Sequence, residues 1–252
     1  ELPNVVACVA FSPEADRYRF AASSLDGTAK IWEWNPEEDS VEVSAVLTGH
    51  TGVINQIKWS STGEQLLTVG EDDAPRLWTE ENGKMVSVQL PVENLDDFDF
   101  KCVAFSPDGE WIAAGGQTNK SGGDIGLLWK RVGDTYQQHS SINDNLSGLN
   151  AVGFIPGIAP GSQQLVTGSG NGAVMVWPIE ANSLAPPFAL PKWDASASSN
   201  EAHKRPVTSI DTAPDGTIVS ASEDGTAVIW LEYRKTPANA GGPAAVRGGD
   251  GI

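Results

Sequence analysis

The chain alternates short apolar segments with polar turns, and this pattern occurs five times. Each repeat begins with an apolar segment that runs into a turn rich in Pro, Gly, Asp and Ser: VACVAFSPEA, INQIKWSSTG, FKCVAFSPDG, LNAVGFIPGI and VTSIDTAPDG. A second apolar segment follows, and a third ends in tryptophan: Trp32, Trp78, Trp129, Trp177 and Trp230. Short segments between turn residues predict β-strands, and no stretch shows a helical period.

A fourth, weaker apolar segment separates each tryptophan from the next repeat. It reads VSAVL (43–47), MVSVQL (85–90), TYQQHSSI (135–142) and PFAL (187–190). Four strands in a unit of about 45 residues, repeated without helices, predict small antiparallel sheets around a central axis. Such a sheet is too small to stand alone, so it must bury its faces against its neighbours.

This pattern resembles the WD-repeat β-propeller family. Spacing, turn chemistry and tryptophan recur together from residue 5 to about 233, although the residue after each tryptophan is not the Asp of the family pattern. The resemblance implies an all-β propeller of four-stranded antiparallel blades over residues 1–234. The five repeats lie at about 5–47, 50–90, 96–142, 145–190 and 203–234. A Gly/Ala/Pro-rich tail at 235–252 is expected to be disordered.

Five repeats leave the ring incomplete, because propellers of this family most often have seven blades. A ring must join its ends, since an open sheet edge recruits other strands. Two further blades elsewhere in a longer chain, blades from another subunit, or an uncommon five-bladed ring would each account for the count. The chain starts at Glu1 rather than Met, and we favour the first explanation.

Two histidines recur at the same place in the repeat. His50 precedes Ile57 of its first strand by the same interval that separates His203 from Ile210. The resemblance implies that such a histidine joins a hydrogen-bonded tetrad with a Ser or Thr, an Asp and the Trp of its blade. The two implied tetrads are His50, Thr68, Asp72 and Trp78, and His203, Ser220, Asp224 and Trp230.

The same residue types form the Ser/His/Asp triad of hydrolases. A catalytic triad occurs once and needs an exposed nucleophile with an oxyanion hole, whereas this set recurs in two repeats. We therefore interpret the tetrads as structural and predict no catalytic residue. The other repeats keep parts of the set: Asp26 with Ala22 and Leu2 in the first, Asp96 in the third, and Thr167 with Asn171 and Asn145 in the fourth.

Charge and cysteine content narrow the partners. Thirty-three acidic and sixteen basic residues give a formal net charge of −17, which disfavours nucleic acid and anionic membranes. The charge permits a basic peptide as partner, although acidic residues also serve solubility alone.

Cys8 and Cys102 occupy the same position in two CVAFSP segments, so a disulfide between them is not expected. Two free thiols favour the cytoplasm or another reducing compartment.

Other motifs add little. TGSGNG (167–172) lacks the GK[ST] ending and the helix of a phosphate loop, so it is interpreted as a turn. ENLDDFD (93–99) lacks the glycine of a calcium loop. His139 has no partner at metal-ligand spacing and is expected on an outer strand. NKS at 119 and NLS at 145 match the glycosylation pattern without a secretory signal. We predict neither metal nor cofactor.

Function is then expected on the surface. In the family, the histidine-bearing connections and the Asp-bearing turns emerge on one rim, the top, which commonly binds peptides and proteins. Transferred by position, this top rim presents Thr51, Glu71, Asp73, Asn119, Lys120, Lys204, Arg205 and Glu223. The connection 182–203 adds Trp193, which either anchors a partner or folds back over a blade edge.

These observations predict a non-catalytic scaffold that binds partner proteins or peptides at the top rim and the Trp193 loop. The alternative from another class is a sensor or regulatory segment of a larger signalling enzyme whose catalytic domain lies outside this chain. A propeller enzyme with its site in the central channel is a third hypothesis. The apolar and small residues of the first strands do not support it.

Overall fold

The computed structural model describes residues 5–72, 74–93, 98–118, 126–143, 147–157, 159, 161–181, 183–190, 203–230 and 245–248. Within these residues, twenty strands form five four-stranded sheets, each a meander of consecutive antiparallel strands. The five sheets are blades 1 to 5, and the predicted all-β architecture is confirmed. The described part of the chain contains no helix that is long and apolar enough to cross a membrane.

The strand bounds follow the predicted repeats. Blade 1 contains β1 (Val6–Phe11), β2 (Arg19–Ser24), β3 (Ala29–Asn35) and β4 (Ser40–Leu47). Blade 2 contains β5 (Ile54–Trp59), β6 (Gln65–Gly70), β7 (Arg76–Glu81) and β8 (Lys84–Gln89). Blade 3 contains β9 (Phe98–Phe105), β10 (Trp111–Thr118), β11 (Gly126–Val132) and β12 (Thr135–Ile142). Blade 4 contains β13 (Leu149–Pro156), β14 (Gln163–Ser169), β15 (Val174–Pro178) and β16 (Phe188–Ala189). Blade 5 contains β17 (Val207–Thr212), β18 (Ile218–Ser222), β19 (Ala227–Trp230) and β20 (Ala245–Gly248).

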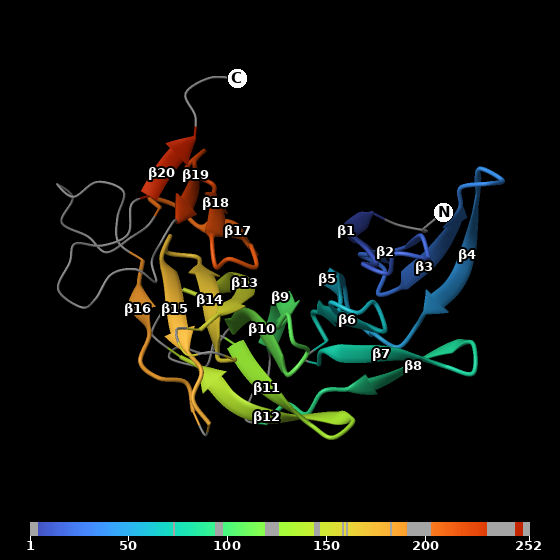
Figure 1. The fold of residues 1–252 in the computed structure, drawn as a ribbon, viewed down its shortest axis with the longest axis horizontal. Coiled ribbons are helices and arrows are strands. Elements are labelled where there is room, and N and C mark those ends of the chain that lie inside the picture. Colours follow the sequence, from blue (N-terminus) through green and yellow to red (C-terminus); the bar gives the residue numbers. More distant parts are fainter. Residues whose placement is uncertain are drawn as a thin grey trace.

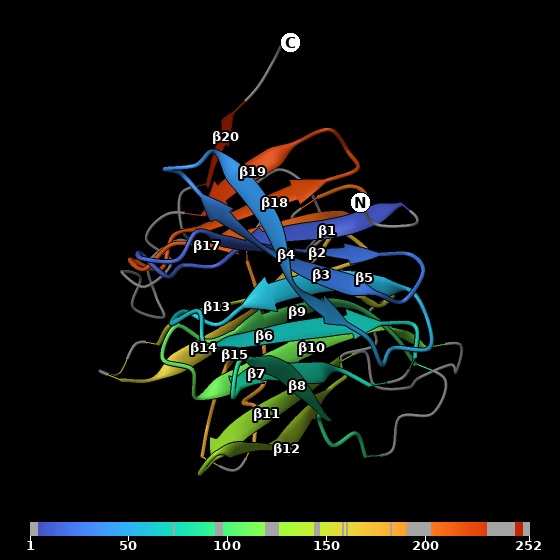
Figure 2. The ribbon, with the colours of Figure 1, turned by 90° about the vertical axis from the view of Figure 1, so that its right-hand side faces the viewer.

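The blades form an arc. Their innermost strands β1, β5, β9, β13 and β17 contact one another in that order, and the outer strands fan away from them (Figure 1). Blade 1 lies at one end of the arc and blade 5 at the other. Figure 2 looks onto the blade 1 end, with β4 nearest the viewer.

Each pair of neighbouring blades shares one apolar core. Between blades 1 and 2, Ala21 and Ile31 of blade 1 pack with Leu66 and Trp78 of blade 2. The same combination recurs at the other three interfaces: Leu67 and Leu77 with Ile112 and Trp129, Ala113 and Leu128 with Leu165 and Trp177, and Val166 and Val176 with Ile218 and Trp230. The face that carries the tryptophan, called the tryptophan face below, is therefore covered by an aliphatic pair of the preceding blade.

The first and second strands of a blade are joined by tight turns. In the SPDG segment 106–109, the N–H of Gly109 donates to the carbonyl of Ser106 at 3.0 Å. In APDG (213–216), Gly216 donates to Ala213 at 2.9 Å. Gly109 has a φ of 70° and Gly216 a φ of 89°, which glycine adopts without steric cost. The predicted turns are confirmed.

Innermost strands are also linked by side chains. The register of β5 shifts between Ile54 and Gln56, and that of β13 between Leu149 and Ala151. The residue at each irregularity reaches the next blade. Asn55 Nδ2 donates to the carbonyl of Phe100 at 2.9 Å, and Asn150 Nδ2 donates to that of Val207 at 3.0 Å. The bulges in β5 and β13 thus each let one asparagine side chain form a hydrogen bond to the next blade.

Blade 5 takes its fourth strand from the Gly/Ala/Pro-rich segment 235–252. The backbone of β20 pairs with β19, with Ala245 opposite Trp230 and Gly248 opposite Ala227. The composition of the segment did not indicate this pairing, and its other residues lie outside the described part of the chain. Both end blades therefore have four strands.

Candidate functional site

The structure joins His50, Thr68, Asp72 and Trp78 in one run of hydrogen bonds. His50 Nδ1 lies 2.7 Å from Asp72 Oδ1 and 2.8 Å from Oδ2. His50 Nε2 lies 2.6 Å from the hydroxyl oxygen of Thr68, which also accepts from Trp78 Nε1 at 2.8 Å. An ionised carboxylate can only accept, so His50 Nδ1 carries a proton and donates it to Asp72. Every polar atom of the run has a partner.

The carboxylate of Asp72 is held in its ionised form. Burial alone would raise its pKa. The hydrogen bond and charge of His50, the N–H of Thr51 and the charge of Arg76 outweigh burial and lower the pKa below its ordinary value. The side chain of His50 has no exposed surface and that of Asp72 has 4 %. A hydroxyl sealed in this way is unavailable as a nucleophile for a substrate.

Blade 5 arranges its tetrad residues differently. His203 Nε2 lies 2.7 Å from the Ser220 hydroxyl, which accepts from Trp230 Nε1 at 3.1 Å. His203 Nδ1 lies nearer to Thr226 Oγ1, at 3.0 Å, than to Asp224 Oδ2, at 3.5 Å. Thr226 Oγ1 in turn donates to Asp224 Oδ1 at 2.5 Å. Thr226 therefore lies between histidine and carboxylate, where blade 2 has Ala74.

Asp224 is the more strongly perturbed carboxyl group. Burial of its side chain, which is 7% exposed, would raise its pKa, but hydrogen bonds from the Thr226 side chain and from the N–H groups of Lys204 and Thr226, with the charge of His203, lower it to about 2. An ordinary aspartate has a value of 3.8. Asp224 is thus an anion held by protein hydrogen-bond donors at the base of the Lys204 loop.

In the other blades, the indole N–H or the carboxylate at the tetrad positions has different hydrogen-bond partners. Trp177 Nε1 in blade 4 donates to Thr167 Oγ1 at 2.9 Å, as in the complete sets. Trp129 Nε1 in blade 3 donates instead to the carbonyl of Pro91 at 2.7 Å. In blade 1, Asp26 accepts from the side chain and the N–H of Thr28. Leu2, Asp96 and Asn145, the residues at the histidine position, lie outside the described residues.

The tetrad carboxylates also fix the top rim. Asp72 Oδ2 accepts from the N–H of Thr51 at 3.0 Å, and Asp224 Oδ2 accepts from that of Lys204 at 2.9 Å. The five rim candidates that the structure describes are exposed: Thr51, Glu71, Lys204, Arg205 and Glu223. Arg205 and Glu223 approach to 3.6 Å. The remaining candidates, Asp73, Asn119, Lys120 and Trp193, lie outside the described residues.

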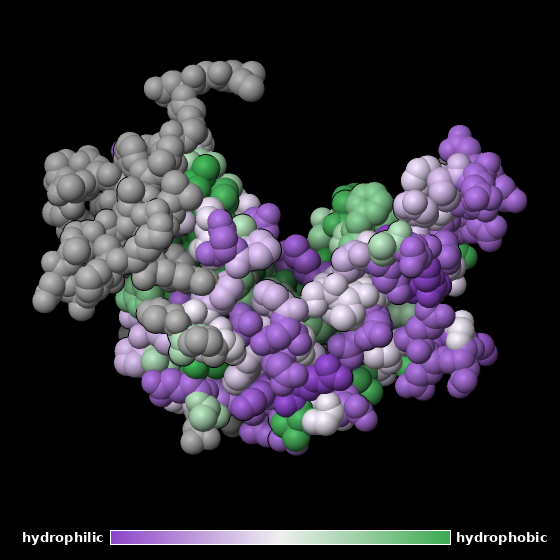
Figure 3. Space-filling model, viewed as in Figure 1, coloured by the Kyte–Doolittle hydropathy of each residue, from purple (hydrophilic) through white to green (hydrophobic). Residues whose placement is uncertain are grey.

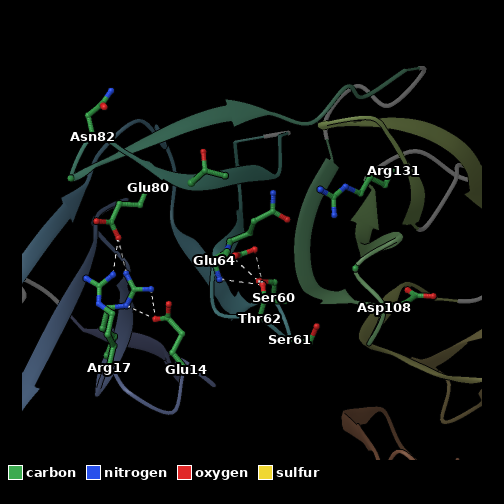
Figure 4. Close-up of a pocket in the computed structure, with 15 residues that line it drawn as sticks. Glu14, Arg17, Ser60, Ser61, Thr62, Glu64, Glu80, Asn82, Asp108 and Arg131 are labelled. Atoms are coloured by element: carbon green, nitrogen blue, oxygen red, sulfur yellow. Dashed lines mark hydrogen bonds and ion pairs between the residues drawn. The ribbon is translucent and has the colours of Figure 1, made fainter.

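A second polar region, which the sequence analysis missed, lies between the turns of blades 1 to 3 (Figure 4). It is a cavity of about 630 Å³ whose lining includes Arg17, Arg19 and Glu80. Glu80 Oε2 lies 3.2 Å from Arg17 and 3.1 Å from Arg19, so it bridges blades 1 and 2. The buried Arg19 also pairs with Glu14. These guanidinium groups are neutralised internally, so the cluster is explained as a latch between blades.

Several weak motifs are structural. In TGSGNG (167–172), Gly172 N–H donates to the Ser169 carbonyl at 3.1 Å, so the predicted turn is confirmed. Burial raises the pKa of the Cys102 thiol to about 12, which makes it a poor nucleophile at neutral pH. His139 lies on β12, within 2.7 Å of Ser140 Oγ and 3.2 Å of the carbonyl of Ala181. In the described part of the chain, no group of three or more His, Cys, Asp or Glu is placed to hold a metal ion.

Comparison with known proteins agrees with this architecture. The family described as WD domain, G-beta repeat matches residues 3–33, 41–79, 96–120 and 196–230. Protein transport protein SEC13-1 of Candida glabrata is 31% identical over 117 residues, 44% of this chain and 37% of that protein. THO complex subunit 3 of Arabidopsis thaliana is 31% identical over 104 residues, 40% of this chain and 31% of that protein. Telomerase protein component 1 of Mus musculus is 24% identical over 212 residues, 83% of this chain and 7% of that protein. The matched stretches thus span about a third or less of these relatives.

Proposed function

Because this chain belongs to the WD-repeat family, we propose that it is a non-catalytic scaffold that binds other proteins or peptides on its top rim. The observation that carries the proposal is the pair of hydrogen bonds that tie rim loops to buried carboxylates, Thr51 to Asp72 and Lys204 to Asp224. A loop fixed in this way loses little entropy when a partner binds. The polar groups inside the blades thus stiffen a binding surface.

The absence of a catalytic role is part of the proposal. Thr68 and Ser220 are fully buried, and His50 and His203 have no exposed side-chain surface. Acyl transfer needs a nucleophile that a substrate can reach. The name of one relative, THO complex subunit 3, agrees with a role in assembly.

The proposed partner is a protein or peptide with a basic segment. The chain has a formal net charge of −17, so long-range attraction favours a cationic partner and opposes nucleic acid. Glu71 and Glu223 are exposed on the described rim. Trp193 supplies the apolar anchor that charged rims otherwise lack.

A regulatory segment of a larger signalling enzyme is the second candidate. Its support is the match to telomerase protein component 1, in which the aligned stretch is a small part of a much longer protein. A nucleotide-binding or kinase motif in the same polypeptide would favour this candidate. Further repeats alone would favour the scaffold.

The test is a pull-down with the full chain as bait. We expect the double variant Glu71→Lys/Glu223→Lys, and separately Trp193→Ala, to lose basic proteins that the wild type retains, as quantified by mass spectrometry. Glu81→Lys, at the end of β7 and also exposed, is the matched control and should retain them. An identical set of retained proteins for all four baits would rule out the rim as the contact.

A further inference from the structure

Blade 1 carries an exposed aromatic pair near the edge opposite the top rim, where β1 turns into β2 and β3 turns into β4. Tyr18 and Trp34 meet edge to face with ring centroids 5.4 Å apart, and they are 49% and 39% exposed. The N–H of Trp34 donates to the carbonyl of Tyr18 at 2.9 Å, so the backbone holds the two residues side by side. Neither residue belongs to an apolar core of the described chain. The pair is therefore a surface feature.

The repeat does not require aromatic residues at this place. In each blade one residue of the second strand lies opposite the repeat tryptophan, and this register aligns the blades. Tyr18 and Trp34 lie two residues outside that pair in blade 1. Their counterparts in blades 2 and 3 are all charged: Glu64, Glu80, Glu110 and Arg131. The aromatic pair is thus particular to blade 1, and the packing of the repeat does not explain it.

Tyr18 and Trp34 belong to the lining of a cavity of about 480 Å³ that is otherwise strongly acidic. Its one basic residue is Arg17, and its acidic residues are Asp16, Glu33, Glu37 and Glu42. Arg17 lies 3.5 Å from Glu33 and 3.2 Å from Glu80 of blade 2, so its charge is already neutralised. Among the residues that the structure describes, no basic side chain pairs with the other three acids of the lining.

The turn between β3 and β4 is held by its own hydrogen bonds. Asn35 Oδ1 accepts from the N–H of Glu37 at 3.0 Å and from that of Glu38 at 3.3 Å. Asp39 follows with a left-handed φ of 48°, which aspartate tolerates better than most residues. The turn projects from the end of the arc (Figure 1), and Figure 3 shows hydrophilic residues over it. A turn fixed in this way loses little entropy when a partner binds.

We propose that Tyr18, Trp34 and the carboxylates of Asp16, Glu37 and Glu42 bind an arginine-containing basic segment of a partner protein. A guanidinium group stacks on aromatic rings and pairs with carboxylates at the same time, which an acidic or a purely apolar segment cannot do. Rings beside unpaired acids are complementary to a cation and repel a phosphate. This Tyr18–Trp34 site lies away from the top rim, so the inference goes beyond the proposed function and does not rest on it.

The test is isothermal titration calorimetry of residues 1–252 with a capped peptide of alternating glycine and arginine, at an ionic strength of about 0.15 M to screen distant charges. We expect Trp34→Leu, which keeps an apolar side chain and removes the ring, to weaken binding about three-fold. Trp34→Phe keeps a ring and should bind more tightly than Trp34→Leu. A peptide of alternating glycine and lysine should bind the wild type more weakly, and one of alternating glycine and glutamate should not bind.

A second pair of variants separates the site from the net charge of the chain. Glu37→Gln/Glu42→Gln removes two exposed carboxylates at the site and should weaken binding of the arginine peptide at least two-fold. Glu93→Gln/Glu110→Gln removes two exposed carboxylates elsewhere and should leave the affinity unchanged. Equal thermal melting of the variants and the wild type shows that they fold. The glutamine variants decide the matter if Trp34→Leu melts early, because their substitutions lie on the surface.

Two results would overturn the inference. Equal affinity of the wild type and a folded Trp34→Leu for the arginine peptide would show that the rings make no contact with it. Equal weakening by the two glutamine variants would show that the peptide responds only to overall charge. Neither result depends on the rim variants of the pull-down, so the two proposals fail separately.

Discussion

Trp78 donates its indole N–H to the hydroxyl of Thr68 at 2.8 Å, inside blade 2. Trp177 and Thr167 in blade 4, and Trp230 and Ser220 in blade 5, repeat the relationship at 2.9 and 3.1 Å. Each hydroxyl lies on the second strand directly beside the third, so a buried indole is satisfied within its own sheet. The histidine adds to this pair where it is present, and blade 4 keeps the pair with asparagine at the carboxylate position.

Replacing His50 with alanine should lower stability without a direct effect on binding. The change leaves the Asp72 carboxylate and the Thr68 hydroxyl buried without their imidazole partner, which costs roughly 1–3 kcal/mol of unfolding free energy. Urea denaturation measures the loss, and partner binding should fall only as far as folding is lost. His139→Ala on β12 is the control, expected to cost less than about 1 kcal/mol. Full stability with a lost activity would contradict the structural role.

Replacing Thr226 with alanine tests the altered geometry of blade 5. Blade 2 has Ala74 at this place, and there His50 contacts Asp72 directly at 2.7 Å. We expect His203 to move onto Asp224 in the same way, so the net loss should stay below about 1 kcal/mol. Ser220→Ala should cost more, because it removes the partner of both His203 and Trp230. Equal losses for the two variants would show that Thr226 is as essential as the shared hydroxyl.

Acid should weaken the anchoring of the Lys204 loop. The folded pKa of Asp224, about 2, lies below the ordinary value of 3.8, so its ionised form stabilises the fold. That contribution is fully present above about 3.8 and is lost as the pH falls to about 2. The difference in unfolding free energy between wild type and Asp224→Asn should therefore be largest near neutral pH and shrink over this window. A constant difference down to pH 2 would contradict the assignment.

The amides that tie innermost strands together should each contribute modestly. Asn55→Ala and Asn150→Ala remove bonds of 2.9 and 3.0 Å to the next blade, at an expected cost of about 1 kcal/mol each. Thr208 occupies the same place in blade 5, where the described chain has no following blade. Thr208→Ala is therefore the matched control and should be neutral in this chain. A loss at Thr208 equal to that at Asn55 would show that the cost comes from the strand itself.

The fold could be predicted from the sequence because the same pattern of strands and turns occurs five times. Trp32 and its four counterparts recur beside turns of similar composition, and each further copy of the pattern supports the same strand assignment. Histidine, hydroxyl and carboxylate positions could be assigned by register, and the structure brings those of blade 2 together as the register indicates. Hydrogen bonds that depend on a residue found in a single repeat could not be predicted in this way.

Thr226 is an example of a contact that the alignment of the repeats does not predict. Its side chain interposes between His203 and Asp224, and nothing in the spacing distinguishes it from Ala74. The acceptor of Trp129, the carbonyl of Pro91, is a backbone atom that no motif records. Arg19 and Glu80 lie in different repeats, and their pairing depends on how two blades pack. Such contacts follow from three-dimensional proximity and not from period.

Among the strands that the structure describes, each sheet pairs four strands that are consecutive in the chain, and no blade lends a strand to another. Duplicating or deleting a whole blade at the loops between blades would therefore break no strand pairing. It would disturb only the two apolar contacts with the neighbouring blades. Genes for such chains can lengthen or shorten by one module at a time, and the product after each step still has intact sheets.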